Sequence, residues 1–168
     1  AGIVPDQEAV VCDGVRFTYA ETHARVRRLA AALARLGVGR GTRVAALQTN
    51  SHRYVETYYA TAMLGGVFIP LNYRAKPPEL AHMLTTGEVR VLLVGARYLG
   101  AVEAILPGLT ELRVIIGLDG PTREYPGYED LLAAAGEHGE EADVDDDDTT
   151  ILMYTSGTTA LPKGVMLR

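Results

Sequence analysis

Two spacings of hydrophobic positions alternate along most of the chain. Short, continuous apolar runs predict buried strands, and they lie at 43–47, 67–71, 89–94, 112–118 and 150–155. Apolar residues at helical spacing predict helices between them, over 20–36, from the cap Ser51 to about 64, 77–86, 98–105 and 128–135. Strands that alternate with helices predict an α/β fold with a largely parallel sheet flanked by helices.

The N-terminal segment has a different pattern. Two short β-type runs between Val10 and Tyr19 are separated by Asp13-Gly14, which predicts a hairpin with a tight turn. Thr18 and Glu21 then have the spacing of a capping box, in which a hydroxyl and a carboxylate satisfy backbone N–H groups at a helix start. We therefore expect the first helix to begin directly after the hairpin.

The C-terminal part contains an acidic stretch and ends in an apolar run. Residues 137–148 include eight of the 21 acidic residues, so we predict an exposed loop that is too charged to pack. The consecutive carboxylates 145–148 cannot all converge on one cation, and we interpret them as solvated. The final residues 165–168 have the pattern of a strand in mid-course, whereas domain boundaries usually fall in polar linkers. The sheet is therefore expected to be incomplete within this chain.

Charge argues against a nucleic-acid partner. The 168 residues include 16 basic and 21 acidic side chains, a net charge of −5, whereas duplex-binding domains usually carry a basic excess. Six of the fourteen arginines lie between Arg25 and Arg43, and we interpret this cluster as a solvated helix face.

The number of cysteines and the lengths of the apolar runs indicate the cellular compartment in which the protein is expected. Cys12 is the only cysteine, so no disulfide forms within the chain and a reducing environment is expected. Its apolar neighbours Val10 and Val11 predict a buried packing residue rather than a catalytic thiol. No run approaches the roughly 18 apolar residues of a membrane span, and no signal-peptide pattern opens the chain. We expect a cytoplasmic protein without a membrane span.

Histidines and tyrosines give no clear site. The four histidines show no ligand spacing and are interpreted as solvated or packing residues: His23, His52, His82 and His138. Three tyrosines of the second predicted helix, Tyr54, Tyr58 and Tyr59, are assigned to core packing rather than to a ligand platform.

The most informative segment is 154–164, with the sequence Tyr-Thr-Ser-Gly-Thr-Thr-Ala-Leu-Pro-Lys-Gly. Four Ser/Thr residues, two glycines and Lys163, one of only two lysines, directly follow a buried strand. Such a loop can present backbone N–H groups and hydroxyls to phosphate oxygens, with the lysine as a point charge. Ligands usually bind beyond the carboxyl ends of strands in open α/β sheets. These residues alone leave two readings open, a phosphate site and a polar surface turn.

Two common phosphate-binding loops are excluded. In a Walker loop a Gly-Lys-Ser/Thr triplet ends the motif, but here Pro162 and Gly164 occupy the positions of the glycine and the hydroxyl. The run 37–41, Gly-Val-Gly-Arg-Gly, lacks the spacing of a dinucleotide fingerprint and follows a helix instead of a strand. We interpret it as a helix stop and turn.

The whole string 154–164 resembles the phosphate-binding signature of the adenylate-forming enzymes, the superfamily of acyl-CoA synthetases, luciferases and peptide-synthetase adenylation domains. Segments 17–21, 37–44 and 64–74 resemble further motifs of that superfamily, in the expected order. Asn72-Tyr73-Arg74 and the Thr158-Thr159 pair are more similar to acyl-CoA synthetases, as in long- or medium-chain fatty-acid–CoA ligases, than to peptide synthetases.

This resemblance implies a fold, a reaction and a site. Residues 1–168 would be the N-terminal portion of an AMP-binding (adenylation) domain, ending just after the loop. The family uses ATP and Mg²⁺ to convert a carboxylic acid, here expected to be a fatty acid, to an acyl-adenylate, and this branch then transfers the acyl group to coenzyme A. By motif position the ATP phosphates would contact Thr155, Ser156, Gly157, Thr158, Thr159 and Lys163, and Thr155 would also contact Mg²⁺. No catalytic residue is assigned within this chain, and a homodimer is among the assemblies open to it.

Two departures from the family pattern limit what the chain can do. Ala160 stands where the family usually has Gly or Ser, and at a positive φ an alanine costs about 1 kcal/mol or more. The family's adenine motif, its main magnesium-binding glutamate and its adenylation lysine all lie beyond the loop, so the 168 residues alone are expected to be inactive. The alternatives are another type of adenylate-forming enzyme and a non-catalytic module that binds nucleotide or a subunit through an open sheet edge.

Overall fold

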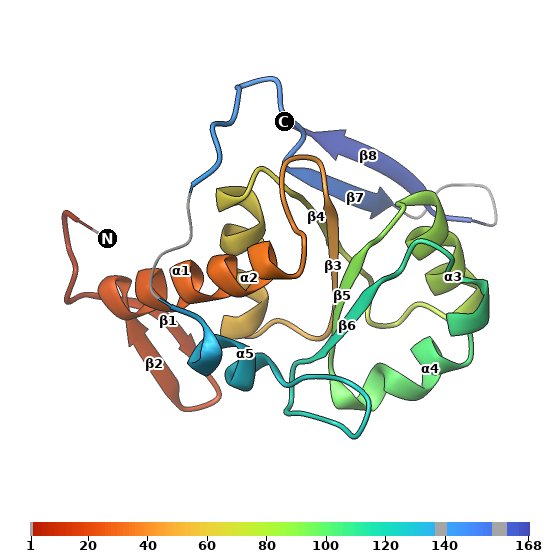
Figure 1. Ribbon diagram of the computed structural model, residues 1–168, viewed down its shortest axis with the longest axis horizontal. Coiled ribbons are helices and arrows are strands. Elements are labelled where there is room, and N and C mark those ends of the chain that lie inside the picture. The colour runs from red at the N-terminus through yellow and green to blue at the C-terminus, as the bar shows by residue number, and fades with distance from the viewer. Residues whose placement is uncertain (1, 137–140, 156–160) are drawn as a thin grey trace.

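A six-stranded sheet forms the centre of the molecule in a computed structural model that describes residues 2–136, 141–155 and 161–168 (Figure 1). Its strand order is β6-β5-β3-β4-β7-β8. The bounds are β3 Arg43–Leu47, β4 Val67–Pro70, β5 Val91–Val94, β6 Val114–Gly117, β7 Ile151–Thr155 and β8 Lys163–Leu167. The first five strands of that order pair in parallel, and β8 is antiparallel to β7. The predicted α/β fold with a largely parallel sheet is therefore confirmed.

Helices cover both faces of the sheet (Figure 1). One face packs against α1 (Tyr19–Arg35), α2 (His52–Met63) and α5 (Tyr128–Ala134), and the other against α3 (Pro77–Thr86) and α4 (Leu99–Glu103). Short 3₁₀ turns lie at Ala96–Tyr98 and Leu106–Gly108. In β3, Val44 belongs to the first core and Ala45 to the second. Since the central strands are buried on both faces, they appear in the sequence as continuous apolar runs.

The N-terminal hairpin is a separate two-stranded sheet of β1 (Glu8–Cys12) and β2 (Val15–Thr18). Asp13 and Gly14 have φ values of 48° and 81°, as a two-residue hairpin turn of type I′ requires. The capping box is present, because Glu21 N donates to Thr18 Oγ1 at 3.2 Å and Thr18 N donates to Glu21 Oε2 at 2.8 Å. The burial expected for Cys12 is wrong, since its side chain is only half-buried: this narrow ribbon is not covered on both faces.

Acidic side chains partner several of the clustered arginines. Arg40 donates to Asp145 at 2.8 Å and to Asp148 at 2.9 Å, and Arg43 pairs with Glu88 at 3.3 Å. Residues 141–148, the described part of the acidic stretch, contain no helix or strand. They form the predicted loop, but ion pairs fasten it to the body of the protein.

A buried carboxylate joins the three helices on one face of the sheet. Glu56 of α2 is fully buried, and it accepts hydrogen bonds from Arg25 Nε of α1 at 2.8 Å and from the Tyr128 hydroxyl of α5 at 2.6 Å. Burial, together with the Glu56 carboxylate, raises the pKa of Tyr128 well above its usual value. Burial alone would raise the pKa of Glu129, but hydrogen bonds from Arg25 and Arg53 outweigh that effect and lower it. The network therefore favours a neutral Tyr128 hydroxyl, which donates, and an ionised Glu129 carboxylate, which accepts.

Among the residues that the structure describes, no helix is long and apolar enough to cross a membrane.

Candidate phosphate-binding site

The segment 154–164 connects β7 to β8 and leaves the sheet beyond the carboxyl end of β7. Because β7 is parallel to β4, the segment lies at the edge where the parallel strands end, the usual position of ligand sites in open α/β sheets. Four of the predicted contacts, Ser156, Gly157, Thr158 and Thr159, lie outside the described residues, as does Ala160. Thr155 and Lys163 are described and flank this stretch.

Thr155 and Lys163 are brought together by the register of the hairpin. They are directly opposed in the pairing of β7 with β8, so their side chains project from the same face. The Thr155 hydroxyl donates to the Lys163 carbonyl at 3.5 Å, and both residues are exposed. In the described part of the chain no carboxylate pairs with Lys163. Its ammonium group is thus available to an anion at the base of the loop.

The glycine at the end of the motif faces a tyrosine. Gly164 is paired with Tyr154, and a Cβ at Gly164 would lie 3.0 Å from Leu152 Cδ1 and 3.5 Å from Tyr154 Cε1. A glycine at this position therefore leaves room for these side chains to lie across β8. The Tyr154 side chain belongs to the core on the α3 side of the sheet.

Contacts between the base of the loop and α3 were not predicted from the sequence. The Tyr154 hydroxyl is 2.7 Å from Thr86 Oγ1 and donates to the Met83 carbonyl at 3.1 Å. His82 Nε2 is 3.0 Å from the carbonyl oxygen of Pro162. His82 was interpreted as a solvated or packing residue, and the structure shows that it contacts the segment directly. The one signal in the sequence is the spacing of His82 and Thr86, which places both on one face of the helix.

Other polar groups lie at the same edge of the sheet, after β3, β4 and β6. Gln48 Nε2 donates to Asp119 Oδ1 at 3.1 Å, and the other Asp119 oxygen accepts from the backbone N–H of Ala96 at 2.8 Å. In the Asn-Tyr-Arg segment, Asn72 Oδ1 accepts from the Arg74 N–H at 3.0 Å. These contacts order the loops that follow the strands, and none of them involves Thr155 or Lys163.

A metal ion at this site would depend on oxygen ligands from few residues. Within the described ranges there is no group of three or more His, Cys, Asp or Glu side chains able to hold a metal. These ranges contain three of the four histidines. Among the described residues, the Thr155 hydroxyl makes one long hydrogen bond, of 3.5 Å, and Thr155 is exposed, so its lone pairs are accessible from this part of the chain. One hydroxyl fits Mg²⁺, which typically takes one or two protein ligands and completes its shell with phosphate oxygens and water.

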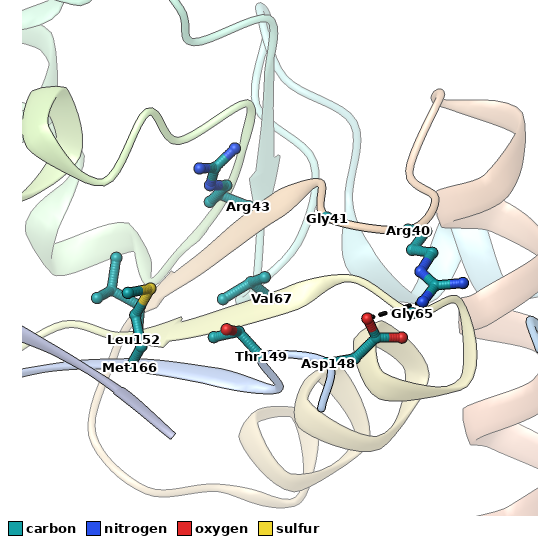
Figure 2. A pocket seen from close by; sticks show the side chains of 9 residues that line it. All are labelled: Arg40, Gly41, Arg43, Gly65, Val67, Asp148, Thr149, Leu152 and Met166. Carbon is teal, nitrogen blue, oxygen red and sulfur yellow. Dashed lines mark hydrogen bonds and ion pairs between the residues drawn. The ribbon is translucent and has the colours of Figure 1, made fainter. Parts of the chain in front are cut away.

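A cavity of about 360 Å³ lies at the opposite edge of the sheet (Figure 2). Arg43 and Val67, the first residues of β3 and β4, line it, and the ion pair between Arg40 and Asp148 lies at its side. The remaining lining residues are Gly41, Gly65, Thr149, Leu152 and Met166. Because this cavity is at the amino ends of the parallel strands, it is separate from the candidate phosphate site.

Comparisons with known proteins identify the family to which this fold belongs. The family model described as "AMP-binding enzyme" matches residues 1–168, and the chain belongs to this family. Its curated relatives include acid–CoA ligases.

Two curated relatives illustrate the range of substrates. A long-chain-fatty-acid–CoA ligase from Thermus thermophilus is 41% identical over 155 residues, covering 90% of this chain and 28% of the relative. A feruloyl-CoA synthase from Amycolatopsis sp is 40% identical over 167 residues, covering 99% of this chain and 31% of the relative. The chain thus spans about a third of the length of the curated relatives it matches.

Solved structures show the same fold. An anthranilate CoA ligase, AuaEII, solved in complex with anthranoyl-AMP, superposes with a TM-score of 0.94 at 28% identity, over 98% of this chain and 32% of that chain. A fatty acyl CoA synthetase of Mycobacterium tuberculosis gives a TM-score of 0.88 at 30% identity, over 99% and 32%. The α/β architecture is therefore that of the N-terminal part of acyl-CoA ligases.

Proposed function

We propose that these 168 residues act as the N-terminal part of a longer, cytoplasmic ligase. This ligase activates a carboxylic acid with ATP to an acyl-adenylate and transfers the acyl group to coenzyme A. The observation that carries the proposal is the segment 154–164, which matches the phosphate signature and leaves the carboxyl edge of a parallel sheet. The acid–CoA ligases among the relatives support it.

In this proposal each residue of the segment has a role in binding the ATP phosphates. Lys163 supplies a positive charge and Thr155 a hydroxyl at the base of the loop, and Ser156, Gly157, Thr158 and Thr159 supply further hydroxyl and N–H donors. Adenylation places negative charge on the departing pyrophosphate, so donors fixed in advance stabilise the transition state. Mg²⁺, when bound near Thr155, would neutralise part of the phosphate charge.

We propose a fatty acid as the substrate, with aromatic acids as the competing class. The relative that acts on long-chain fatty acids and the relative named for feruloyl-CoA differ by one percentage point in identity to this chain. A panel of aliphatic and aromatic acids with the full-length protein distinguishes the two classes. A preference for aromatic acids in kcat/KM would overturn the fatty-acid assignment while leaving the ligase reaction intact.

The test of the proposed function is carboxylate-dependent exchange of pyrophosphate into ATP by the full-length protein. Replacing Lys163 by Ala is expected to lower the exchange rate by about 10²- to 10³-fold, as removal of one charge-stabilising donor does in other enzymes. Lys76→Ala is the matched control, because Lys76 is the other lysine, is exposed, and lies at the start of α3. Absence of exchange with every acid, or equal rates for both variants, would contradict the proposal and favour a non-catalytic binding module.

A further inference from the structure

We propose that one face of α3 positions the phosphate-binding segment for adenylation, with His82, Thr86 and Tyr154 as positioning residues. We call these three residues and their backbone partners the α3 anchor. The inference rests on the proposed function of segment 154–164, and it assigns a role to contacts that the phosphate signature does not include.

The first half of the anchor holds the strand that enters the loop. The Tyr154 hydroxyl lies 2.7 Å from Thr86 Oγ1 and 3.1 Å from the Met83 carbonyl, and Thr86 Oγ1 also donates to the His82 carbonyl at 2.7 Å. Because the Thr86 hydrogen is used by the His82 carbonyl, the single Tyr154 hydrogen is shared between Thr86 Oγ1 and the Met83 carbonyl. These contacts link the end of β7 to the last turn of α3. Tyr154 immediately precedes Thr155, the predicted phosphate and Mg²⁺ contact.

The second half holds the chain where it returns from the loop. His82 Nε2 is 3.0 Å from the Pro162 carbonyl oxygen. A carbonyl oxygen only accepts, so Nε2 carries the hydrogen and donates it. Pro162 has no N–H of its own and a fixed φ, which leaves its carbonyl as its backbone hydrogen-bonding group. Pro162 immediately precedes Lys163, so the fixed carbonyl lies one residue from the lysine.

The two halves converge on one rigid helix face. His82 and Thr86 are four residues apart, and such residues are neighbours on a helix surface. The opposite side of α3 is firmly packed, because Leu80, Met83 and Leu84 are almost completely buried. Thr155 and Lys163, the described residues that flank the loop, are thus held next to this surface through their neighbours Tyr154 and Pro162. Donors that need no reorganisation are the more effective ones in stabilising transition-state charge.

The proposal predicts a specific split between the two half-reactions. Loosening the anchor displaces donors that act on the departing pyrophosphate, so adenylation slows and KM for ATP rises. Thioester formation from a supplied acyl-adenylate and coenzyme A involves no pyrophosphate, and its rate is expected to stay unchanged. A residue that only stabilises the fold would lower both rates together through loss of folded protein.

The experiment uses the full-length protein and measures both half-reactions. His82→Leu removes the N–H donor at similar size, whereas His82→Gln keeps a donor near the position of Nε2. Tyr154→Phe removes the hydroxyl, and Thr85→Val is the control, since Thr85 is exposed and its side chain makes no hydrogen bond in the described structure. We expect His82→Leu and Tyr154→Phe each to reduce kcat/KM for ATP by about five- to tenfold, the effect of losing one hydrogen bond. His82→Gln should recover most of that loss, and Thr85→Val should behave as the native protein.

Three results would overturn the α3 anchor: unchanged adenylation in both His82→Leu and Tyr154→Phe, an equal fall in both half-reactions, or no recovery with His82→Gln. Lys163→Ala, measured in parallel, separates this failure from failure of the proposed function. If Lys163→Ala is impaired and the anchor variants are not, the phosphate site stands and the anchor does not. If Lys163→Ala is also unimpaired, the proposed function itself is wrong.

Discussion

The buried Glu56 provides a sharp test of how a single residue holds this fold together. Its carboxylate is fully buried and is bound by Arg25 and the Tyr128 hydroxyl. Replacing Glu56 by Ala leaves the buried Tyr128 hydroxyl without its acceptor and removes one of the two carboxylate partners of Arg25. Removing one partner of a buried pair typically costs about 3 to 5 kcal/mol, and we expect about 3 kcal/mol here because Arg25 retains Glu129. The free energy of urea unfolding of the 168-residue chain measures this loss.

An ion pair in the N-terminal hairpin of β1 and β2 offers a matched control for the pair of Arg25 and Glu56. Arg16 and Glu8 pair at 2.8 Å, the distance between Arg25 and Glu56, but both Arg16 and Glu8 side chains are more than half exposed. Exposed ion pairs contribute about 1 kcal/mol or less, so Glu8→Ala should scarcely change the unfolding free energy. Similar losses for the two variants would show that burial does not set the strength of the Glu56 network.

At the residue scale, local contacts were predictable and distant ones were not. Thr18 and Glu21 are three residues apart, and the capping box that their spacing predicts is present. Glu56 was not singled out, because its partners Arg25 and Tyr128 are 31 and 72 residues away and only the folded arrangement of α1, α2 and α5 brings them together. The contact of His82 with Pro162 was not predicted for the same reason, since the two residues are 80 positions apart.

At the scale of elements, the contact between α3 and β7 depends on a glycine. Gly87 follows α3, and a Cβ there would lie 2.7 Å from the Met83 carbonyl, 3.0 Å from Ile69 Cδ1 and 3.2 Å from the Tyr154 hydroxyl. Gly87→Ala would therefore push the end of α3 away from the sheet. We expect a lower unfolding temperature in thermal denaturation followed by circular dichroism, with a loss of stability of about 1 to 3 kcal/mol.

Gly100→Ala is the comparison for this prediction. Gly100 lies within α4, and a Cβ there would meet nothing within 4 Å. Alanine is the better helix former by about 1 kcal/mol, so this variant should be as stable as the native chain or more so. Equal unfolding temperatures for the two variants would argue against close packing at Gly87.

Whether a segment is a helix or a strand could be predicted from the sequence more reliably than which strands are neighbours in the sheet. Residues 43–47 were predicted as a strand and are β3, and the helix predicted over 77–86 is α3. The strand predicted over 112–118 is shorter, Val114–Gly117. The helix predicted over 98–105 is also shorter, Leu99–Glu103, and it follows a 3₁₀ turn at Ala96–Tyr98. The strand order β6-β5-β3-β4-β7-β8 was not predictable, because apolar runs buried on both faces carry no information about which strands are neighbours.

At the scale of the whole molecule, the β7–β8 end of the sheet differs from the rest. Central strands β3 and β5 are buried almost throughout, whereas every residue of β8 is exposed. Large apolar side chains are exposed on this end of the sheet: Met153, Leu161, Val165, Met166 and Leu167. Met153 is paired with Val165 on one face of the hairpin, and Met166 lies on the other face. Large exposed apolar surface commonly marks an interaction site. The proposed ligase would cover this surface with polypeptide that its longer relatives also possess.

This arrangement leads to the last prediction, that residues 1–168 alone neither adenylate an acid nor form a thioester. In the proposed function Thr155 and Lys163 contact the phosphates, but the resemblance places the adenine motif, the main magnesium ligand and the adenylation lysine beyond this segment. The chain spans 28% to 33% of the relatives compared, so most donors that such a reaction needs would be missing. Pyrophosphate exchange should therefore be undetectable with the 168-residue chain and present with the full-length protein. Exchange by the isolated chain would show that its own residues suffice for catalysis, and the assignment of catalytic groups to later positions would then be wrong.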